Sequence, residues 1–214
     1  HFGEAAVIVV TGADGFIGKH LCARLECRGE IIHRIDLKRG TDIRDCDLPD
    51  AKQVYHLAAQ TDAYCKDARS DASTNIIGSL RVFERYTDRV VFASSAMVNY
   101  PVNPYAISKR VCEDYARYFG CAVVRLPNVY GDGGHSFMEK CAAQDEITIF
   151  GSGDQIRSWC HVNEAVEAFL QAKPGACVVV PGVTQSVNQI ASCFDKPKRY
   201  LPARDGDLMV AVQQ

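Results

Sequence analysis

Apolar and polar positions follow a strand–helix–strand rhythm over the first 130 residues. Short runs rich in β-branched residues alternate with longer stretches in which apolar residues recur at helical spacing. Because these runs are continuously apolar, we expect strands buried on both faces of a parallel sheet, and hence a doubly wound α/β fold. The expected strands are 6–10, 31–35, 54–57, 90–93 and 122–126, and the expected helices are 16–28, 73–85 and 104–119.

The pattern changes after Tyr130, where three glycines interrupt the chain within four residues. Shorter elements follow, which predicts a small C-terminal α/β lobe packed against the first sheet. We therefore expect one domain over 1–127 and a reduced lobe over 128–214. Its expected helices are 137–143, 162–172 and 187–194, and its expected strands are 146–150 and 177–180.

Composition narrows the classes of function. The chain has 214 residues, enough for a full core, and 24 basic against 26 acidic side chains give a net charge of −2. This balance argues against general binding of nucleic acid or an anionic membrane. The apolar run 5–10 is too short for a membrane span and lacks the features of a signal peptide, so we expect a cytoplasmic protein. The opening residues 1–3 are left out of the fold argument.

The ten cysteines form no CxxC pair, so we expect reduced thiols, mostly buried, and neither disulfides nor a metal site.

A glycine-rich turn directly follows the first expected strand. Gly12, Gly15 and Gly18 form a GxxGxxG pattern that opens the first helix, with Phe16 and Ile17 inside it. Glycines allow a tight turn and close backbone approach, and the N-terminus of the helix offers free N–H groups to a pyrophosphate. The alternative is an ordinary strand-to-helix turn.

Asp36 ends the second expected strand, eighteen residues beyond Gly18. An acid at this place accepts hydrogen bonds from an adenosine ribose, which together with the turn predicts a Rossmann-type dinucleotide site. Asp36 would repel a 2′-phosphate, so NAD is expected as the cofactor. Lys38 and Arg39 keep NADP open as the minor alternative; otherwise they belong to a solvated loop.

Tyr105 and Lys109 stand at i and i+4 of an expected helix capped by Asn103 and Pro104, so they share one face. A nearby ammonium would lower the pKa of the tyrosine from about 10 and make it an acid/base. Ser95 lies at the carboxyl end of a strand, where ligands bind in open α/β sheets. The alternatives are a partly buried tyrosine with an exposed lysine, and a serine that caps a turn.

These residues resemble the extended short-chain dehydrogenase/reductase family, the epimerase and dehydratase group that acts on nucleotide sugars. The resemblance runs through nearly the whole chain, and it implies roles for further residues. Asp42 and Ile43 are similar to the family's adenine-contacting pair, and Ala58 lies in a strand-end motif beside the cofactor. Asn75 also fits the family pattern. The resemblance further implies that Lys109 hydrogen-bonds the nicotinamide ribose.

The resemblance also implies a substrate site. Asn128, Arg157 and Arg204 would bind the substrate's diphosphate, a task suited to guanidinium groups, and Ala96 would lie beside the sugar. The sugar dehydratases carry an Asp-Glu pair after the strand-end hydroxyl, where this chain has Ala96 and Met97. Neither side chain carries a proton, so the Ser-Ala sequence is more similar to the 4-epimerase pattern.

The chain is shorter than typical members of the family it resembles, especially between Ser95 and Tyr105. Ser158 occupies a position that is usually acidic in that family. The first hypothesis is an NAD-dependent epimerase of a nucleotide sugar. A keto-sugar reductase with the same residues is the second, and a non-catalytic dinucleotide sensor or scaffold is the third. By resemblance, a homodimer is expected in which helices 73–85 and 104–119 pair across a two-fold axis.

Overall fold

A six-stranded parallel sheet forms the centre of the protein, seen in a computed structural model that describes residues 7–62, 64, 67–204 and 207–211. The strand order is β2-β1-β3-β4-β5-β9, and all five pairings are parallel. The doubly wound fold is therefore confirmed. Its strands are β1 (Ile8–Thr11), β2 (Ile32–Ile35), β3 (Gln53–His56), β4 (Val90–Ser95), β5 (Ala122–Leu126) and β9 (Cys177–Val179).

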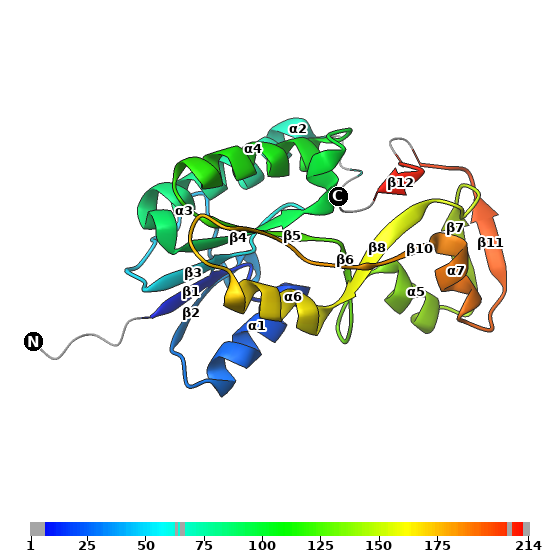
Figure 1. Ribbon diagram of the computed structural model, residues 1–214, viewed down its shortest axis with the longest axis horizontal. Helices are drawn as coiled ribbons and strands as arrows, with labels where there is room; N and C mark the ends of the chain where they lie inside the picture. Colours follow the sequence, from blue (N-terminus) through cyan, green and yellow to red (C-terminus); the bar gives the residue numbers. More distant parts are fainter. Residues whose placement is uncertain (1–6, 63, 65–66, 205–206, 212–214) are drawn as a thin grey trace, which may run out of the picture.

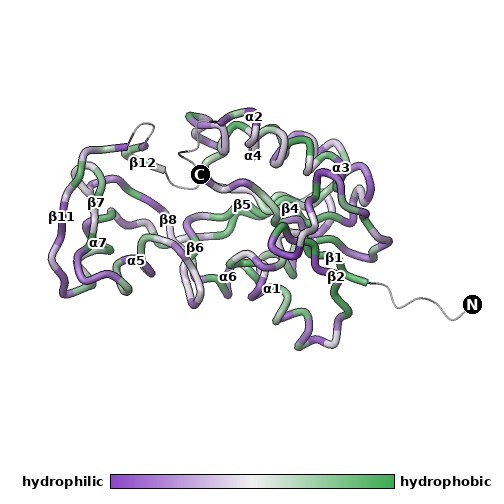
Figure 2. The backbone as a smooth tube through the Cα atoms, turned by 180° about the vertical axis from the view of Figure 1, so that it is seen from behind, coloured by the Kyte–Doolittle hydropathy of each residue, from purple (hydrophilic) through white to green (hydrophobic). Residues whose placement is uncertain are grey.

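Helices cover both faces of this sheet (Figure 1). On one face lie α1 (Phe16–Cys27) and α6 (Val162–Gln171); on the other lie α2 (Ala68–Asp71), α3 (Gly78–Tyr86) and α4 (Pro104–Tyr118). Successive strand residues point to opposite faces, so Val10 packs beneath α1 and α6 while Val9 packs beneath α3 and α4. This alternation explains why the strand sequences are continuously apolar, as the hydrophobic colouring of the sheet shows (Figure 2).

The expected second helix is a composite. It starts as α2, passes through the π-helical segment η2 (Ala72–Ile77) and continues as α3. A π-helical turn adds a residue to the helical path and is often found at functional sites. Three short 3₁₀ helices also occur in this part of the chain. They are η1 (Leu37–Arg39) after β2, η3 (Thr87–Arg89) after α3 and η4 (Ala96–Asn99) after β4.

The second lobe lies beyond the carboxyl ends of the sheet strands (Figure 1). It contains a sheet in which β8 (Ile156–His161) pairs with β6 (Asn128–Tyr130), β10 (Val183–Ser186) and β12 (Val210–Ala211). A two-stranded sheet joins β7 (Ile147–Phe150) to β11 (Lys198–Leu201), and a small core fixes it to α5 (Phe137–Ala143) and α7 (Val187–Ser192). The outer strand β11 is largely hydrophilic (Figure 2).

Residues 162–180 return from this lobe to the first sheet. Helix α6 packs against α1, and β9 pairs with β5. The expected domain boundary between residues 127 and 128 stays a prediction. In the structure, α6 and β9 come after this boundary in the sequence but pack with the first sheet. This return ties the small lobe to the sheet at two points, since the chain leaves after β5 and comes back through α6.

Sequence periodicity located every strand of the main sheet, but it assigned β9 to the lobe, whereas β9 pairs with β5. It missed β6, β8, β10, β11 and β12. No strand was expected at the position of the central strand β8. Its sequence, Ile-Arg-Ser-Trp-Cys-His, has no regular alternation of polar and apolar residues, and tertiary pairing on both edges stabilises it as a strand.

The nine described cysteines are free thiols, and five of them are buried; Cys65 lies outside the described residues. Within the described ranges, no cluster of three possible metal ligands occurs and no helix is long and apolar enough to cross a membrane. The cytoplasmic location stays a prediction.

Candidate active site

The turn between β1 and α1 has room for glycine alone. Gly12 has a φ of +68°, and a Cβ added there would lie 2.7 Å from the backbone nitrogen of Ala58. A Cβ on Gly18 would lie 2.1 Å from the carbonyl oxygen of Gly12. The N-cap of α1 is Gly15, and no side chain bonds the first N–H groups of the helix. These donors are therefore presented to an anion at the mouth of the turn.

Asp36 lies at the edge of the same turn with 8% of its surface exposed. Its carboxylate accepts hydrogen bonds from the backbone N–H groups of Asp14 and Lys38, each at 2.9 Å. These bonds fix the carboxylate while leaving it further lone pairs for a diol. Asp36 thus lies where a ribose acceptor is needed.

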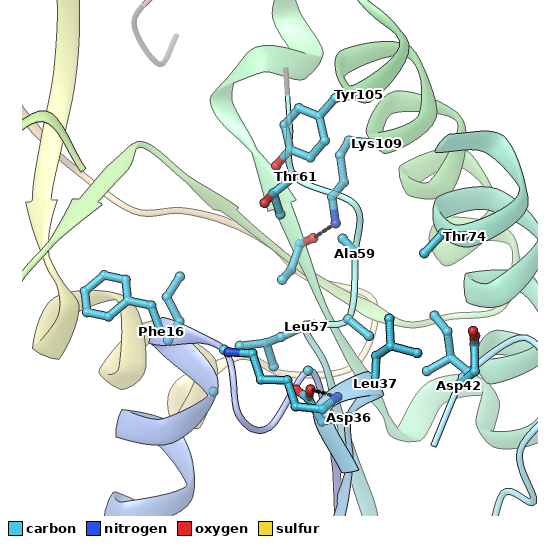
Figure 3. A pocket seen from close by; sticks show the side chains of 18 of the residues that line it. Phe16, Asp36, Leu37, Asp42, Leu57, Ala59, Thr61, Thr74, Tyr105 and Lys109 are labelled. Carbon is cyan, nitrogen blue, oxygen red and sulfur yellow. Dashed lines mark hydrogen bonds between the residues drawn. The ribbon is translucent and has the colours of Figure 1, made fainter. Parts of the chain in front are cut away.

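One cavity of about 520 Å³ brings together every residue expected to bind the cofactor (Figure 3). Asp42, whose pKa is lowered by its hydrogen bonds with Arg44, and the buried Ile43 form the end away from Tyr105. The cavity suits a dinucleotide in size and in its donors and acceptors. The wall includes Gly12, Gly15, Phe16, Ile17, Gly18, Asp36, Asp42, Ile43, Ala58 and Lys109.

Tyr105 and Lys109 project from the first turns of α4 into this cavity (Figure 3). The helix begins as expected: Pro104 is its first residue, and the side chain of Asn103 accepts a hydrogen bond from the N–H of Ala106 at 2.8 Å. Ser95 ends β4, and its side chain is hydrogen-bonded to that of Tyr105. The structure thus brings together the three residues proposed as catalytic.

The electrostatics differ from the expectation in one respect. Burial raises the pKa of Tyr105 above its ordinary value of 10, although the hydrogen bond from Ser95 opposes the rise. Burial also lowers the pKa of Lys109 to about 8. The expected lowering of the tyrosine pKa is therefore wrong for the protein's own groups, because loss of solvent outweighs the hydrogen bond from Ser95 and the charge of Asp71 adds to the rise.

Lys109 is 4% exposed, and its ammonium donates a hydrogen bond to the carbonyl of Ala93 at 2.8 Å. The Nζ atom also lies 4.7 Å from the ring centre of Phe92 and 5.9 Å from that of Tyr105. The carbonyl holds the ammonium at the cavity wall, where two of its three protons are still available to a ligand. This arrangement suits a group that binds a ribose hydroxyl while facing the phenol.

Two buried networks support these groups. His56 joins Thr11 at 2.6 Å to Ser79 at 2.9 Å, and burial lowers the pKa of His56 to about 3, so the imidazole is neutral. This network ties β1, β3 and α3 together beneath the cofactor cavity. No role for His56 was expected from the sequence.

The second network surrounds Asn75 on η2. Its Nδ2 donates to Asp71 at 2.9 Å and to Ser108 at 3.1 Å, and its Oδ1 accepts from the N–H of Gln60 at 2.7 Å. The bond to Ser108 joins η2 to α4, and the other two join η2 to α2 and to the loop after β3. Asn75 therefore positions the helix that carries Tyr105.

The residues expected to bind substrate lie around the second lobe. The guanidinium of Arg157 pairs with Asp207 at 2.5 Å, and Asn128 donates to the carbonyl of Ser158 at 3.1 Å. Arg204 lies 3.6 Å from the ring centre of Phe150. These three expected residues line one cavity of about 490 Å³. Ala96 is 8% exposed and is not part of the wall of any of the three cavities described here.

A third cavity, of about 480 Å³, joins the other two. It shares Tyr105 with the cofactor cavity, and it shares Asn128 and Arg157 with the lobe cavity. Ser95 also lies in its wall. The three cavities therefore form one crevice that leads from Asp36, past the catalytic side chains, to the second lobe.

Sequence reasoning missed two residues of this crevice. His135 lines both the cofactor cavity and the joining cavity. Trp159 is 4% exposed and lines the lobe cavity, and its indole Nε1 is the one buried side-chain polar atom without a hydrogen-bond partner in the described part of the chain. Neither position carries a local signal, because each becomes part of a site only when the lobe folds over the sheet.

Comparison with known proteins decides the family. The profile of the NAD dependent epimerase/dehydratase family matches residues 8–174. The chain belongs to this family. Its members use NAD, and the crevice described above has the residues to hold it.

Individual relatives of this family member differ in activity. A putative UDP-glucose 4-epimerase of Methanocaldococcus jannaschii is 29% identical over 243 residues, covering 86% of this chain and 80% of that protein. A dTDP-4-dehydro-6-deoxy-D-allose reductase of Streptomyces bikiniensis is 28% identical, covering 77% and 71%. The solved UDP-glucose 4-epimerase of Thermotoga maritima with UDP-glucose is 26% identical, with a TM-score of 0.84 and coverage of 97% and 89%.

The alignment with the archaeal relative is longer than this epimerase/dehydratase family member itself, 243 positions against 214 residues. The relative therefore contains internal segments that this chain lacks, which agrees with the expected shortening. The loop between Ser95 and Tyr105 is short: it consists of η4 and a few residues that lead to Asn103, the N-cap of α4.

Proposed function

We propose that this chain is an NAD-dependent epimerase of a nucleotide sugar, with Tyr105 as the acid/base. The observation that carries the proposal is the crevice in which Ser95, Tyr105 and Lys109 lie between a dinucleotide cavity and a second, arginine-lined cavity. A sugar placed at Tyr105 would have its nucleotide in the lobe. When bound, NAD supplies the acceptor and later the donor of a hydride.

In this mechanism the Tyr105 oxygen takes the proton of a sugar hydroxyl while the hydrogen on the same carbon leaves as hydride. A keto sugar forms, and the two transfers reverse on its other face. To accept this proton Tyr105 must be a phenolate, and because burial raises its pKa, the phenolate would have to be stabilised by the ammonium of Lys109 and the positive charge of bound NAD⁺. Ser95 would hydrogen-bond the reacting oxygen, and Lys109 would hold the nicotinamide ribose.

Features of the lobe cavity support a nucleotide diphosphate as the second ligand. Arg157 and Arg204 provide guanidinium groups, and Phe150 and Trp159 provide aromatic surface. The buried Nε1 of Trp159 has a proton to donate, and a ligand acceptor would remove the cost of leaving that donor unpaired. No proton-carrying side chain follows Ser95, since Ala96 and Met97 occupy these positions, which argues against water elimination.

The second candidate is a keto-sugar reductase, which would use the same residues but consume the reduced cofactor. The reductase of Streptomyces bikiniensis among the relatives favours it. A non-catalytic sensor fits the observations less well, because the hydrogen-bonded Ser95 and Tyr105 in an open crevice have no evident use in it.

The decisive experiment mixes the protein with catalytic amounts of NAD and either UDP-glucose or UDP-glucuronic acid and, in a separate reaction, with a stoichiometric amount of NADH and dTDP-4-keto-6-deoxyglucose. Sugar analysis and absorbance of the reduced nicotinamide are followed together. Interconversion of a UDP-sugar with its 4-epimer and no net absorbance change supports the epimerase. Stoichiometric consumption of NADH with the keto sugar would establish the reductase instead. Binding of NAD without any turnover would favour the sensor.

A homodimer is part of the proposal. Ile107, Tyr115 and Tyr118 expose 48%, 40% and 82% of their surface along one side of α4, and Ile77 on the adjoining η2 exposes 55%. Apolar side chains grouped in this way are typical of protein interfaces. Sedimentation equilibrium should show a dimer, and Ile107→Glu should shift it toward monomer without changing NAD affinity.

A further inference from the structure

Four charged side chains meet at the end of the cofactor cavity that holds Asp36. Two are acidic, Asp14 and Asp36, and two are basic, Lys38 and Arg39. Asp36 and Lys38 line the cavity itself. A 2′-phosphate, which distinguishes NADP from NAD, would enter this group of charges, so its hydrogen bonds decide which groups are available to that phosphate.

Arg39 is held by Asp14. Its Nε lies 2.6 Å from Oδ2 of Asp14, and its Nη2 donates to Oδ1 at 3.0 Å. This two-pronged contact uses the face of the guanidinium that would otherwise bind a phosphate. Arg39 is also the main cause that holds the pKa of Asp14 below its ordinary value.

The backbone of Asp14 completes the contact. Its N–H donates to the Asp36 carboxylate at 2.9 Å, and its carbonyl accepts from the Lys38 ammonium at 3.1 Å. The glycine turn is thereby joined to the loop after β2 by bonds to three different side chains. Asp14 is the common member of all of them.

The loop that carries Arg39 is fixed from within. The carbonyl of Asp36 accepts from the N–H of Arg39 at 2.8 Å and from the hydroxyl of Thr41 at 2.9 Å, and Gly40 closes the turn with a φ of +76°. The guanidinium is therefore presented toward the glycine turn by a short, bonded loop. Whether the guanidinium is paired therefore depends on an acceptor in the glycine turn, which here is the carboxylate of Asp14.

We infer that Asp14 is a specificity-determining residue for the cofactor: its carboxylate sequesters Arg39 and thereby excludes a 2′-phosphate in favour of a free ribose diol. With Asp14 present, the four side chains sum to no net charge. Removing its carboxylate leaves a net positive group with an unoccupied guanidinium beside the ribose position. The exclusion thus depends on two acids, Asp36 by direct repulsion and Asp14 by holding the cation.

The test measures dissociation constants of NAD⁺ and NADP⁺ by calorimetry, so it does not depend on the sugar substrate or on turnover. The variants are Asp14→Asn, which removes the charge but keeps the size and the backbone N–H, and Asp14→Asn combined with Arg39→Gln. Asp47→Asn, an exposed acid later in the same connection, is the matched control for net charge.

For Asp14→Asn, the dissociation constant of NADP⁺ should fall at least about tenfold, while that of NAD⁺ changes by less than about threefold. The gain should disappear in the double variant and shrink with added salt. Asp47→Asn should show no such gain. An unchanged ratio in Asp14→Asn would overturn the inference, and so would a gain that persists without Arg39. Failure of the unaltered protein to bind NAD⁺ would instead contradict the cofactor itself.

Discussion

The two ends of the crevice hold their functional groups in different ways. At the sheet, Lys109 and Asp36 are buried, and each is held by a hydrogen bond with a backbone group. In the lobe, Arg157 pairs with another charged side chain, Asp207, and donates one further hydrogen bond to the backbone carbonyl of its neighbour Ile156. Backbone and core contacts cannot rearrange without unfolding, whereas paired side chains exchange partners easily. The difference is consistent with the proposal, in which the sheet carries the reacting groups and the lobe binds the substrate's nucleotide.

The largest expected effect is at the sheet end. Tyr105→Phe removes one oxygen and should lower kcat by about 10³-fold, within the range for loss of a general acid/base. NAD affinity, measured by calorimetry, should stay within about twofold because the ring is kept. Ser95→Ala serves as the graded control, with a smaller loss. Turnover that survives in Tyr105→Phe would place the chemistry elsewhere in the crevice.

The next prediction compares the loss of stability when an ion pair is broken at the sheet with the loss when one is broken in the lobe. Glu113 on α4 is 3% exposed, and it accepts hydrogen bonds from Ser94 and from Arg125, whose Nη2 donates at 2.6 Å. Glu113→Gln breaks a buried ion pair and should lower the free energy of unfolding by about 3–5 kcal/mol in urea titrations. Asp207→Asn, which breaks the corresponding pair in the lobe, should cost less than half as much. Equal losses would mean that the lobe is as rigid as the sheet.

A smaller effect is expected on binding in the lobe. Arg157→Ala should weaken UDP binding by about tenfold or more in calorimetry, because a guanidinium contact with phosphate is lost. The free energy of unfolding in urea should fall no more than in Asp207→Asn, because the same ion pair is broken. Arg199→Ala, on the exposed strand β11, is the control, since it removes an arginine of the same lobe outside the cavity. A loss of stability in Arg157→Ala that matches the loss in affinity would assign this arginine a structural role.

The smallest expected effect is a pH dependence of stability. The pKa of Lys109 is about 8 in the folded protein against an ordinary 10.5, so between these values the unfolded chain binds more protons and stability rises with pH. Lys109→Met lacks this contribution. Its melting temperature should exceed that of the unaltered protein by a few degrees at pH 7, since a buried charge is removed, and the gap should narrow toward pH 10. A constant gap would mean that Lys109 does not titrate in this range.

Sequence patterns were sufficient for the elements whose signal is local. The glycine turn, the acid at the end of β2 and the capped helix with Tyr105 and Lys109 follow from short-range sterics and helical periodicity, and the structure brings them to one cavity. The strands of the main sheet were found because burial on both faces demands continuous apolar runs. The same reasoning missed β8, because its sequence has neither a continuous apolar run nor a regular alternation, and it is stabilised as a strand by the strands paired on either side.

Electrostatics also lay beyond the sequence. Helical spacing places Lys109 near Tyr105, but it does not reveal that burial raises the pKa of the phenol and that a carbonyl binds the ammonium. Desolvation depends on every atom that excludes water, so it is a property of the folded protein. The hold of Asp14 on Arg39 is of the same kind, because twenty-five residues separate the two.

The sequence by itself determined the parallel sheet, the dinucleotide turn and the alignment of Tyr105 with Lys109, because each follows from contacts within a few residues or from a burial pattern of fixed period. Only the tertiary structure decided that the return of α6 and β9 joins the lobe to the sheet. It also decided that Trp159 and His135 line the crevice and that Arg157 pairs with Asp207 in the crevice wall. The physical reason is distance along the chain: such contacts form only after folding has brought remote segments together.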